Sequence, residues 1–326
     1  MARVFSGVQP SGAPHLGNYL GAWSRWAREQ SDGHFYCIVD LHAITIPHDP
    51  AVLRERTVDL ACWLLACGLD PDAATLFVQS HVREHSECTW ILNCVASMGE
   101  LQRMVQFKEK SEGRDFISVG LFDYPVLQAA DILLYHADEV PVGEDQRQHV
   151  ELTRDIAQRF NSRFGDTFTL PRATFPKTGA RIMDLQHVDR KMSKSAESPQ
   201  GTIDLADSEE ATRKKIMRAV TDSGSEVRAA PDKQGITNLL DMLSAATGKD
   251  VADLEAHFVG KGYGDFKREV AEAVNGVLRP VRDRYSELRD DPAAVEDLLR
   301  KGADRARAVA AATMDGVRAR VGLLLR

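Results

Sequence analysis

The chain has 326 residues, of which 43% are hydrophobic and 27% are charged, and its net charge is −7. These values are typical of a globular protein with room for two domains, and they argue against disorder and against binding nucleic acid through overall charge. No apolar run approaches the roughly 20 residues of a membrane span and no leader is visible, so we expect a cytoplasmic protein without a membrane segment. From residue 300 onward, seven Lys and Arg face two Asp, which fits either a solvated helix face or a surface for RNA.

The first predicted elements surround a glycine-rich turn. Arg3–Ser6 is predicted to be a strand and Tyr19–Gln30 a helix, and Gly7 and Gly12 between them permit backbone angles closed to other residues. A helix that opens near Gly17 directs free N–H groups toward a ligand above the strand. The stretch therefore predicts a phosphate-binding turn, although an ordinary strand-to-helix turn would leave the same short pattern.

Strands and helices then alternate. His34–Asp40 is a continuous apolar run suited to a central parallel strand, Asp49 and Pro50 mark the start of a helix that reaches Gly68, and Thr75–Ser80 is a third strand. This order predicts a Rossmann-like, doubly wound α/β sheet, whose ligands bind beyond the carboxyl ends of the strands.

Residues from about 105 to 170 are predicted to form an insertion between the two halves of the sheet. A helix over Ser86–Gln106 precedes it. The insertion contains a charged and mobile stretch over Lys108–Gly113 and helices over Pro125–Tyr135 and Gly143–Phe160, and a last strand over Arg181–Leu185 follows. Beyond residue 205 no strand pattern remains. The expected helices are Ser208–Val220, Ile236–Thr247, Val251–Phe258, Phe266–Leu288 and Pro292 to the end, so we divide the chain into residues 1–204 and a helical domain over 205–326.

A second polar stretch, Lys191-Met192-Ser193-Lys194-Ser195, follows the last predicted strand. It is either a solvated basic loop or a pair of cations that closes over a polyphosphate and neutralises the charge that develops on a leaving pyrophosphate.

These stretches together resemble the signatures of class I aminoacyl-tRNA synthetases. Gln9-Pro10-Ser11-Gly12, His15-Leu16-Gly17-Asn18 with Asn18 in place of a second histidine, Gly143-Glu144-Asp145-Gln146, and the lysine loop occur in the order typical of bacterial-type tryptophanyl-tRNA synthetases. The resemblance spans nearly the whole chain. It implies the class I synthetase (HUP-type) core, with an anticodon-binding role for the helical domain and with part of the amino-acid pocket and the dimer contact in the insertion.

The resemblance also implies the site residues. Asp131, a carboxylate among apolar neighbours, would accept a hydrogen bond from an indole N–H, the alternative being a carboxylate satisfied by backbone N–H groups or by a structural Arg. Phe5, Val140 and Val142 would line the indole box, and Tyr124 and Gln146 would hold the ammonium group. ATP would contact Gln9, Pro10, Ser11, Gly17, Asn18, Gly143, Glu144, Asp145, Ile182, Lys191, Met192, Ser193, Lys194 and Ser195, with His15, Lys191 and Lys194 acting in catalysis.

The implied reaction joins tryptophan to tRNA(Trp) through tryptophanyl-adenylate, with ATP as substrate and Mg²⁺ as its counter-ion, in a homodimer. No protein-held metal is expected. Five cysteines without a Cys-x-x-Cys pair predict reduced thiols, and the absence of cysteine after Cys94 argues against the iron–sulfur cluster of some relatives. The alternatives are a tyrosine-specific synthetase, since Asp131 could accept a phenol O–H, a tRNA-independent nucleotidyltransferase of the same superfamily, and a synthetase-like protein that has lost catalysis.

Overall fold

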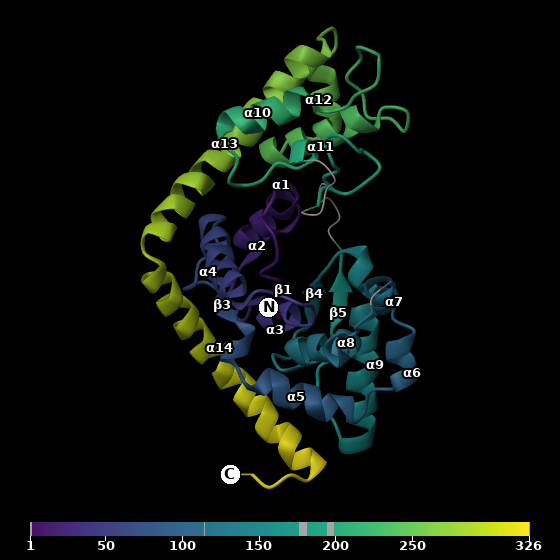
Figure 1. Ribbon diagram of the computed structural model, residues 1–326, viewed down its shortest axis with the longest axis vertical. Coiled ribbons are helices and arrows are strands. Elements are labelled where there is room, and N and C mark those ends of the chain that lie inside the picture. The colour runs from purple at the N-terminus through teal and green to yellow at the C-terminus, as the bar shows by residue number, and fades with distance from the viewer. Residues whose placement is uncertain (1, 114, 176–180, 194–198, 326) are drawn as a thin grey trace.

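Parallel β-structure forms the centre of the N-terminal part of the molecule (Figure 1). The structure, a computed structural model, describes residues 2–113, 115–175, 181–193 and 199–325. Strands β1 (Phe5–Val8), β2 (Phe35–Ile38) and β3 (Thr75–Val78) pair in parallel, as do β4 (Glu139–Pro141) and β5 (Arg172–Thr174). A parallel bridge between Val4 and Glu139 joins the two sets, so the order is β3-β2-β1-β4-β5. The predicted Rossmann-like core is confirmed.

Strands β2 and β3 are shorter than predicted, whereas β1 has the predicted length but is shifted by two residues. β1 begins at Phe5 and continues through Gly7 to Val8, because its partners in β2 extend to Ile38. All four residues of β2 and all four of β3 are buried, as expected for strands with both faces covered.

The helices that cover the sheet follow the predicted order with different ends. The predicted first helix begins earlier and is divided into α1 (Leu16–Asn18), a π-helical turn η1 (Tyr19–Trp23) and α2 (Ser24–Glu29). After β2 come α3 (Asp40–Ala43) and α4 (Pro50–Ala66), and Asp49 caps α4 by accepting the N–H of Ala51 at 2.8 Å. A 3₁₀ turn, η2 (Gln79–His81), follows β3 directly.

The single helix predicted over Ser86–Gln106 is wrong. The structure has α5 (Glu84–Asn93) and α6 (Met98–Gln102), because Ser97 and Glu100 form a capping box that starts a new helix. Most of the stretch predicted to be charged and mobile, Lys108–Gly113, lies in α7 (Val105–Ser111). The remaining helices of the insertion are α8 (Val119–Leu133), the 3₁₀ turn η3 (Glu144–Gln146) and α9 (Arg147–Phe164).

The last predicted strand, Arg181–Leu185, is also wrong. Among the described residues, the segment forms one isolated bridge, between Met183 and Lys191. Its other backbone edge is occupied by the side chain of Asn238, so no neighbouring strand is added there. A short 3₁₀ turn, η4 (Pro199–Gly201), precedes the C-terminal helices.

The C-terminal part is helical, as predicted, and residues 205–325 contain no strand. It consists of α10 (Glu209–Met217), α11 (Gln234–Thr247), α12 (Val251–His257), α13 (Tyr263–Asp290) and α14 (Pro292–Val321). Figure 1 shows α10 to α12 grouped at one end of the molecule, whereas α13 and α14 run back along the α/β core. The boundary at residue 205 stays a prediction, but the last helix of this part packs on β3.

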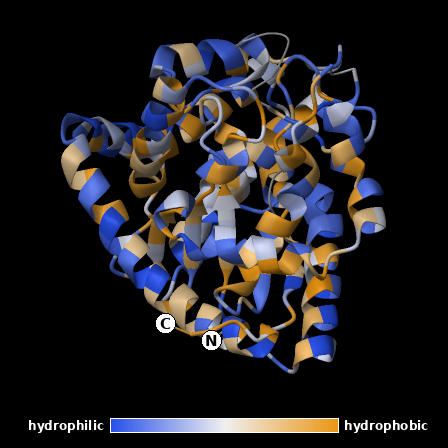
Figure 2. Ribbon diagram, turned by 60° about the horizontal axis from the view of Figure 1, so that its bottom comes forward, coloured by the Kyte–Doolittle hydropathy of each residue, from blue (hydrophilic) through white to orange (hydrophobic). Residues whose placement is uncertain are grey.

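Two apolar clusters hold these parts together. One joins the inner face of α4 to the helices of the C-terminal part, and Trp63 of α4 stacks on Tyr285 of α13 at a ring separation of 3.6 Å. The other lies between the sheet, α5, α8, α9 and α14. In Figure 2 the outer helices alternate hydrophilic and hydrophobic residues along their length, as expected where one face packs and the other is solvated.

All five cysteines are free thiols, and four of them are buried. Burial raises the pKa of Cys37 and Cys88, so both are protonated. In the described part of the chain no helix is long and apolar enough to cross a membrane.

Candidate active site

A cavity of about 370 Å³ lies where β1 and β4 end. Apolar side chains make up much of its wall, and a few polar groups point in from α3, α7, α8 and η3. This combination suits a small organic ligand whose orientation must be fixed. The cavity gathers eight residues that were predicted to bind tryptophan or ATP: Phe5, Gln9, Ser11, Tyr124, Asp131, Val140, Val142 and Gln146.

Asp131 is the charged centre of this cavity and is 1% exposed. Gln79 donates from Nε2 to Oδ1 at 2.6 Å, and Nδ1 of His85 lies 2.6 Å from the same oxygen. Nε2 of His42 lies 2.8 Å from Oδ2. These partners are side chains, not the backbone N–H groups or the Arg considered from the sequence. Because a carboxylate accepts about four hydrogen bonds, Oδ2 retains capacity for a ligand donor.

The same partners fix the charge of Asp131. Burial by itself raises the pKa of this carboxyl, but hydrogen bonds from His42 and His85 outweigh that effect and bring the pKa to about 2. The group is therefore ionised at neutral pH and only accepts hydrogen bonds. A ligand without a donor would leave this charge facing an apolar ring.

A second polar pair lines the opposite wall. The hydroxyl of Tyr124 lies 2.9 Å from Nε2 of His149 and donates to Oε1 of Gln106 at 3.3 Å. His149 must then donate from Nε2, which leaves Nδ1 unprotonated, and that buried atom has no partner among the described residues. Burial, with Lys110 nearby, lowers the pKa of His149 to about 4, while burial raises that of Tyr124 to about 12. Both side chains are neutral at neutral pH.

The second cavity, of about 450 Å³, joins the two signatures that lie far apart in the sequence. Its wall is formed by Ser11, Gly12, His15, Gly17 and Asn18 from the glycine-rich turn and by Lys191, Met192 and Ser193 from the lysine loop. Ser11 lines both cavities, so the two adjoin. A wall of small residues, amide donors and a lysine suits an anion.

Residues 203–205 connect the turn to the lysine loop. Leu16 donates its N–H to the carbonyl of Ile203 at 2.8 Å, and Leu205 donates to the carbonyl of Pro14 at 2.9 Å. An antiparallel bridge between His15 and Asp204 lies between these bonds. Because residues 203–205 follow the lysine loop closely, this pairing ties one end of the loop to the turn.

Gly17 packs closely against the ring of His15. A Cβ atom there would lie 3.0 Å from Nδ1 of His15 and 3.8 Å from Cβ of Ile182. A side chain would therefore press on the His15 ring, which would have to shift by a few tenths of an ångström. Asn18 fixes the same turn by accepting the N–H of His15 on Oδ1 at 3.0 Å.

Several predicted residues line neither cavity. They are Pro10, Gly143, Glu144, Asp145 and Ile182. Glu144 is exposed and pairs with Arg147 at 2.5 Å, whereas Ile182 is buried beside Gly17. Lys194 and Ser195 lie outside the described residues. The binding role of each of these residues stays a prediction.

Seven polar residues near the site were not among the predicted site residues: Ser6, His42, Gln79, His85, Gln106, Lys110 and Gln128. All but Gln79 and His85 line the first cavity, and those two hold Asp131 from behind. The sequence carried a signal for some of them. Gln79 directly follows β3 and His42 lies four residues after β2, and side chains that follow parallel strands meet at one edge of the sheet.

The described residues contain no group of three or more His, Cys, Asp or Glu arranged to hold a metal ion. Among the described residues that line the second cavity there is also no carboxylate. A divalent cation in this site would therefore arrive bound to the oxygens of a phosphate ligand.

Comparison with known proteins agrees with this arrangement. Residues 1–279 match the family model of the class I tRNA synthetases for W and Y. The chain is 54% identical over 327 residues to a protein of Streptomyces avermitilis named tryptophan–tRNA ligase 2, covering 99% of this chain and 97% of that protein.

Solved structures give the same result. The tryptophanyl-tRNA synthetase of Mycoplasma pneumoniae superposes with a TM-score of 0.90 at 38% identity, over 99% of this chain and 98% of that one. The tryptophanyl-tRNA synthetase of Campylobacter jejuni, in a complex with ADP and tryptophan, has a TM-score of 0.83 at 35% identity, over 98% of this chain and all of that one. The chain therefore belongs to the class I tRNA synthetases of the tryptophan and tyrosine family.

Proposed function

We propose that the protein is a tryptophan–tRNA ligase. It activates L-tryptophan with ATP and transfers the amino acid to the 3′ end of tRNA(Trp). The observation that carries this proposal is the ionised, buried Asp131 in an apolar cavity that adjoins an anion-binding cavity. The names of the relatives at about half identity support the same activity.

The amino acid occupies the first cavity. Its indole N–H donates to Oδ2 of Asp131, while Phe5, Val140 and Val142 contact the ring. Tyr124 and Gln146 face the ammonium group. A hydrogen-bonding site of this kind rejects ligands without the donor by about 10⁴–10⁵, because the buried acceptor would be left unpaired.

ATP occupies the second cavity, with its α-phosphate near Ser11, where the two cavities adjoin. The tryptophan carboxylate oxygen forms a bond to the α-phosphorus, and the bond from that phosphorus to the bridging oxygen breaks, which releases pyrophosphate. No protein nucleophile is needed, since the substrate supplies it. His15, Asn18, Lys191 and Lys194 contribute position and charge stabilisation as negative charge moves onto the leaving group.

Further features of the proposal concern partners. Mg²⁺ enters with ATP, in keeping with the described residues of the second cavity wall, none of which is a carboxylate. The helical part over 205–326 contacts the anticodon, and the enzyme acts in the cytoplasm. Large apolar side chains are exposed at Trp90, Phe116 and Val119, which supports a dimer contact in and beside the insertion.

The test is ATP–pyrophosphate exchange with purified protein and Mg²⁺, run with tryptophan, with tyrosine and without amino acid. Exchange that requires tryptophan is the expected result. Exchange with tyrosine alone would overturn the assigned amino acid and keep the chemistry, whereas no exchange with either would refute the proposed function.

A further inference from the structure

Residues 181–185, which pair with Lys191, are held by a side chain from the helical part. Asn238 of α11 accepts the N–H of Met183 on Oδ1 at 2.8 Å, and it donates from Nδ2 to the carbonyl of the same residue at 3.0 Å. Asn238 is 3% exposed, so both bonds are shielded from water. One amide thus satisfies both backbone polar groups of a residue 55 positions away, as a neighbouring strand would do.

The opposite edge of the same segment holds the lysine loop. Met192 donates its N–H to the carbonyl of Ile182 at 3.0 Å, and Asp184 donates to the carbonyl of Arg190 at 2.9 Å. Met183 therefore lies between Asn238 on one side and Lys191 on the other. A shift of Met183 would move Lys191 along the wall of the second cavity.

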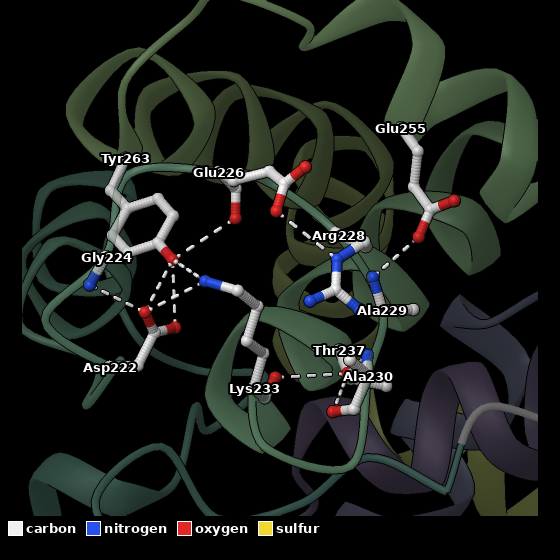
Figure 3. Close-up of polar contacts among 10 residues, drawn as sticks. All are labelled: Asp222, Gly224, Glu226, Arg228, Ala229, Ala230, Lys233, Thr237, Glu255 and Tyr263. Carbon is white, nitrogen blue, oxygen red and sulfur yellow. Dashed lines mark hydrogen bonds and ion pairs between the residues drawn. The ribbon is translucent and has the colours of Figure 1, made fainter.

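Helix α11 is itself fixed at the end that carries Asn238. Figure 3 shows the long loop before this helix closed by polar contacts, in which Nζ of Lys233 lies 3.0 Å from Oδ1 of Asp222 and 2.8 Å from the hydroxyl of Tyr263. The N–H of Ala230 donates to Oγ1 of Thr237 at 3.1 Å, one residue before Asn238. The start of α11 is thus bound to α13, the long helix of the C-terminal part.

A second contact joins the loop before α11 to residues 181–185. Val220 donates its N–H to the carbonyl of Leu185 at 2.8 Å, and a Cβ atom at Gly235 would collide with the carbonyl oxygen of Val220. Helix α11 therefore sits directly against the turn that contacts residue 185. Two contacts, at Met183 and at Leu185, couple the helical part to the base of the lysine loop.

We propose that Asn238 is a positioning residue for adenylate formation: by holding both backbone polar groups of Met183, it sets the place of Lys191 over the ATP phosphates and makes that place depend on the helical part. The inference rests on the proposed function, since it assigns Lys191 to the leaving pyrophosphate. Asn238 touches neither cavity and acts only through Met183.

The test compares Asn238→Ala with a matched variant, Asn275→Ala. Asn275 is a buried amide of the same helical part, but its partners are the carbonyl of Glu209 at 3.0 Å and Arg282 at 3.1 Å. In tryptophan-dependent exchange, Asn238→Ala should lower kcat by about 10- to 100-fold and raise KM for ATP, because small misplacements of a charged group have effects of this size. Calorimetric affinity for tryptophan should stay within about twofold in both variants, since Asn238 does not line the first cavity.

A third variant separates positioning from simple loss of packing. Asn238→Asp keeps the shape and the acceptor for the N–H of Met183 but places an oxygen against its carbonyl. It should be impaired at high pH and recover as the pH falls, because only the protonated carboxyl donates. A kcat equal to wild type in Asn238→Ala, or a parallel loss of tryptophan affinity, would overturn the inference.

Hydrogen exchange provides a readout that does not need activity. The amide of Met192, bonded to Ile182, should exchange at least about tenfold faster in Asn238→Ala than in wild type and should be unchanged in Asn275→Ala. An inactive wild-type protein would refute the proposed function, and unchanged exchange at Met192 would refute the role of Asn238 independently.

Discussion

Replacing Asp131 with Asn tests the centre of the first cavity while keeping its shape. The carboxylate has three contacts, with Gln79, His85 and His42, at 2.6, 2.6 and 2.8 Å. Hydrogen bonds to a charged group contribute about 1.5–3 kcal/mol and neutral ones about 0.5–1.5 kcal/mol. The loss is therefore about 1 kcal/mol per contact, or about 3 kcal/mol in the free energy of unfolding, which a protein of ordinary stability survives.

The effect on tryptophan should be larger than the effect on ATP. Gln79 and His85 both contact Oδ1, so the amide oxygen of the new Asn side chain takes the place of Oδ1. The amide NH₂ then takes the place of Oδ2, where it faces the indole N–H as a second donor. We expect KM for tryptophan in pyrophosphate exchange to rise more than about 100-fold, corresponding to about 3 kcal/mol. KM for ATP should change little, because Asp131 does not line the second cavity.

Asp123→Asn is the matched control. Asp123 lies on the same helix and accepts a hydrogen bond from Nδ2 of Asn93 at 2.9 Å, but it does not line the cavity. Urea denaturation measures the stability of both variants, and exchange kinetics measure the two KM values. A wild-type KM for tryptophan in Asp131→Asn would refute the assigned contact, and an equal rise in Asp123→Asn would show a general effect of α8 instead.

Three further predictions concern pH, packing and the turn. The pKa of His149 is about 4 in the folded protein against an ordinary 6.5, so as the pH falls this imidazole is protonated in the unfolded chain before it is protonated in the folded protein. Stability should be retained above about pH 6.5 and fall by about 3 kcal/mol toward pH 4, and His149→Gln should remove this loss in urea denaturation. A Cβ atom at Gly302 would collide with a backbone oxygen of β3, whereas Gly316 on the same helix has open space. Gly302→Ala should therefore destabilise by about 1–3 kcal/mol or more and Gly316→Ala should stabilise by up to about 1 kcal/mol in thermal denaturation, and equal effects would contradict the packing of α14 on the sheet. Gly17→Ala should raise KM for ATP about tenfold by displacing the His15 ring, with KM for tryptophan as the internal control.

Short stretches of sequence were enough to predict the features that depend only on neighbouring residues. The glycine-rich turn, the Asp49 cap of α4 and the alternation of strands and helices depend on backbone geometry within a few residues, and all were predicted. The strand predicted over Arg181–Leu185 failed because one edge of the segment bonds to a side chain, Asn238, from a distant helix, and the other edge forms a single isolated bridge. Apolar alternation alone cannot distinguish a strand from such a segment.

The sequence by itself indicated the family, the first three strands with the helices between them, and the two signatures that line the second cavity, because each of these depends on residues close together in the chain. Tertiary structure alone decided what surrounds Asp131, which receives its hydrogen bonds from residues 46 to 89 positions away. It also decided that α14 closes the edge of the sheet at β3 and that α11 holds the base of the lysine loop. These contacts depend on how separate elements pack in space, and the pattern along any one element does not contain that information.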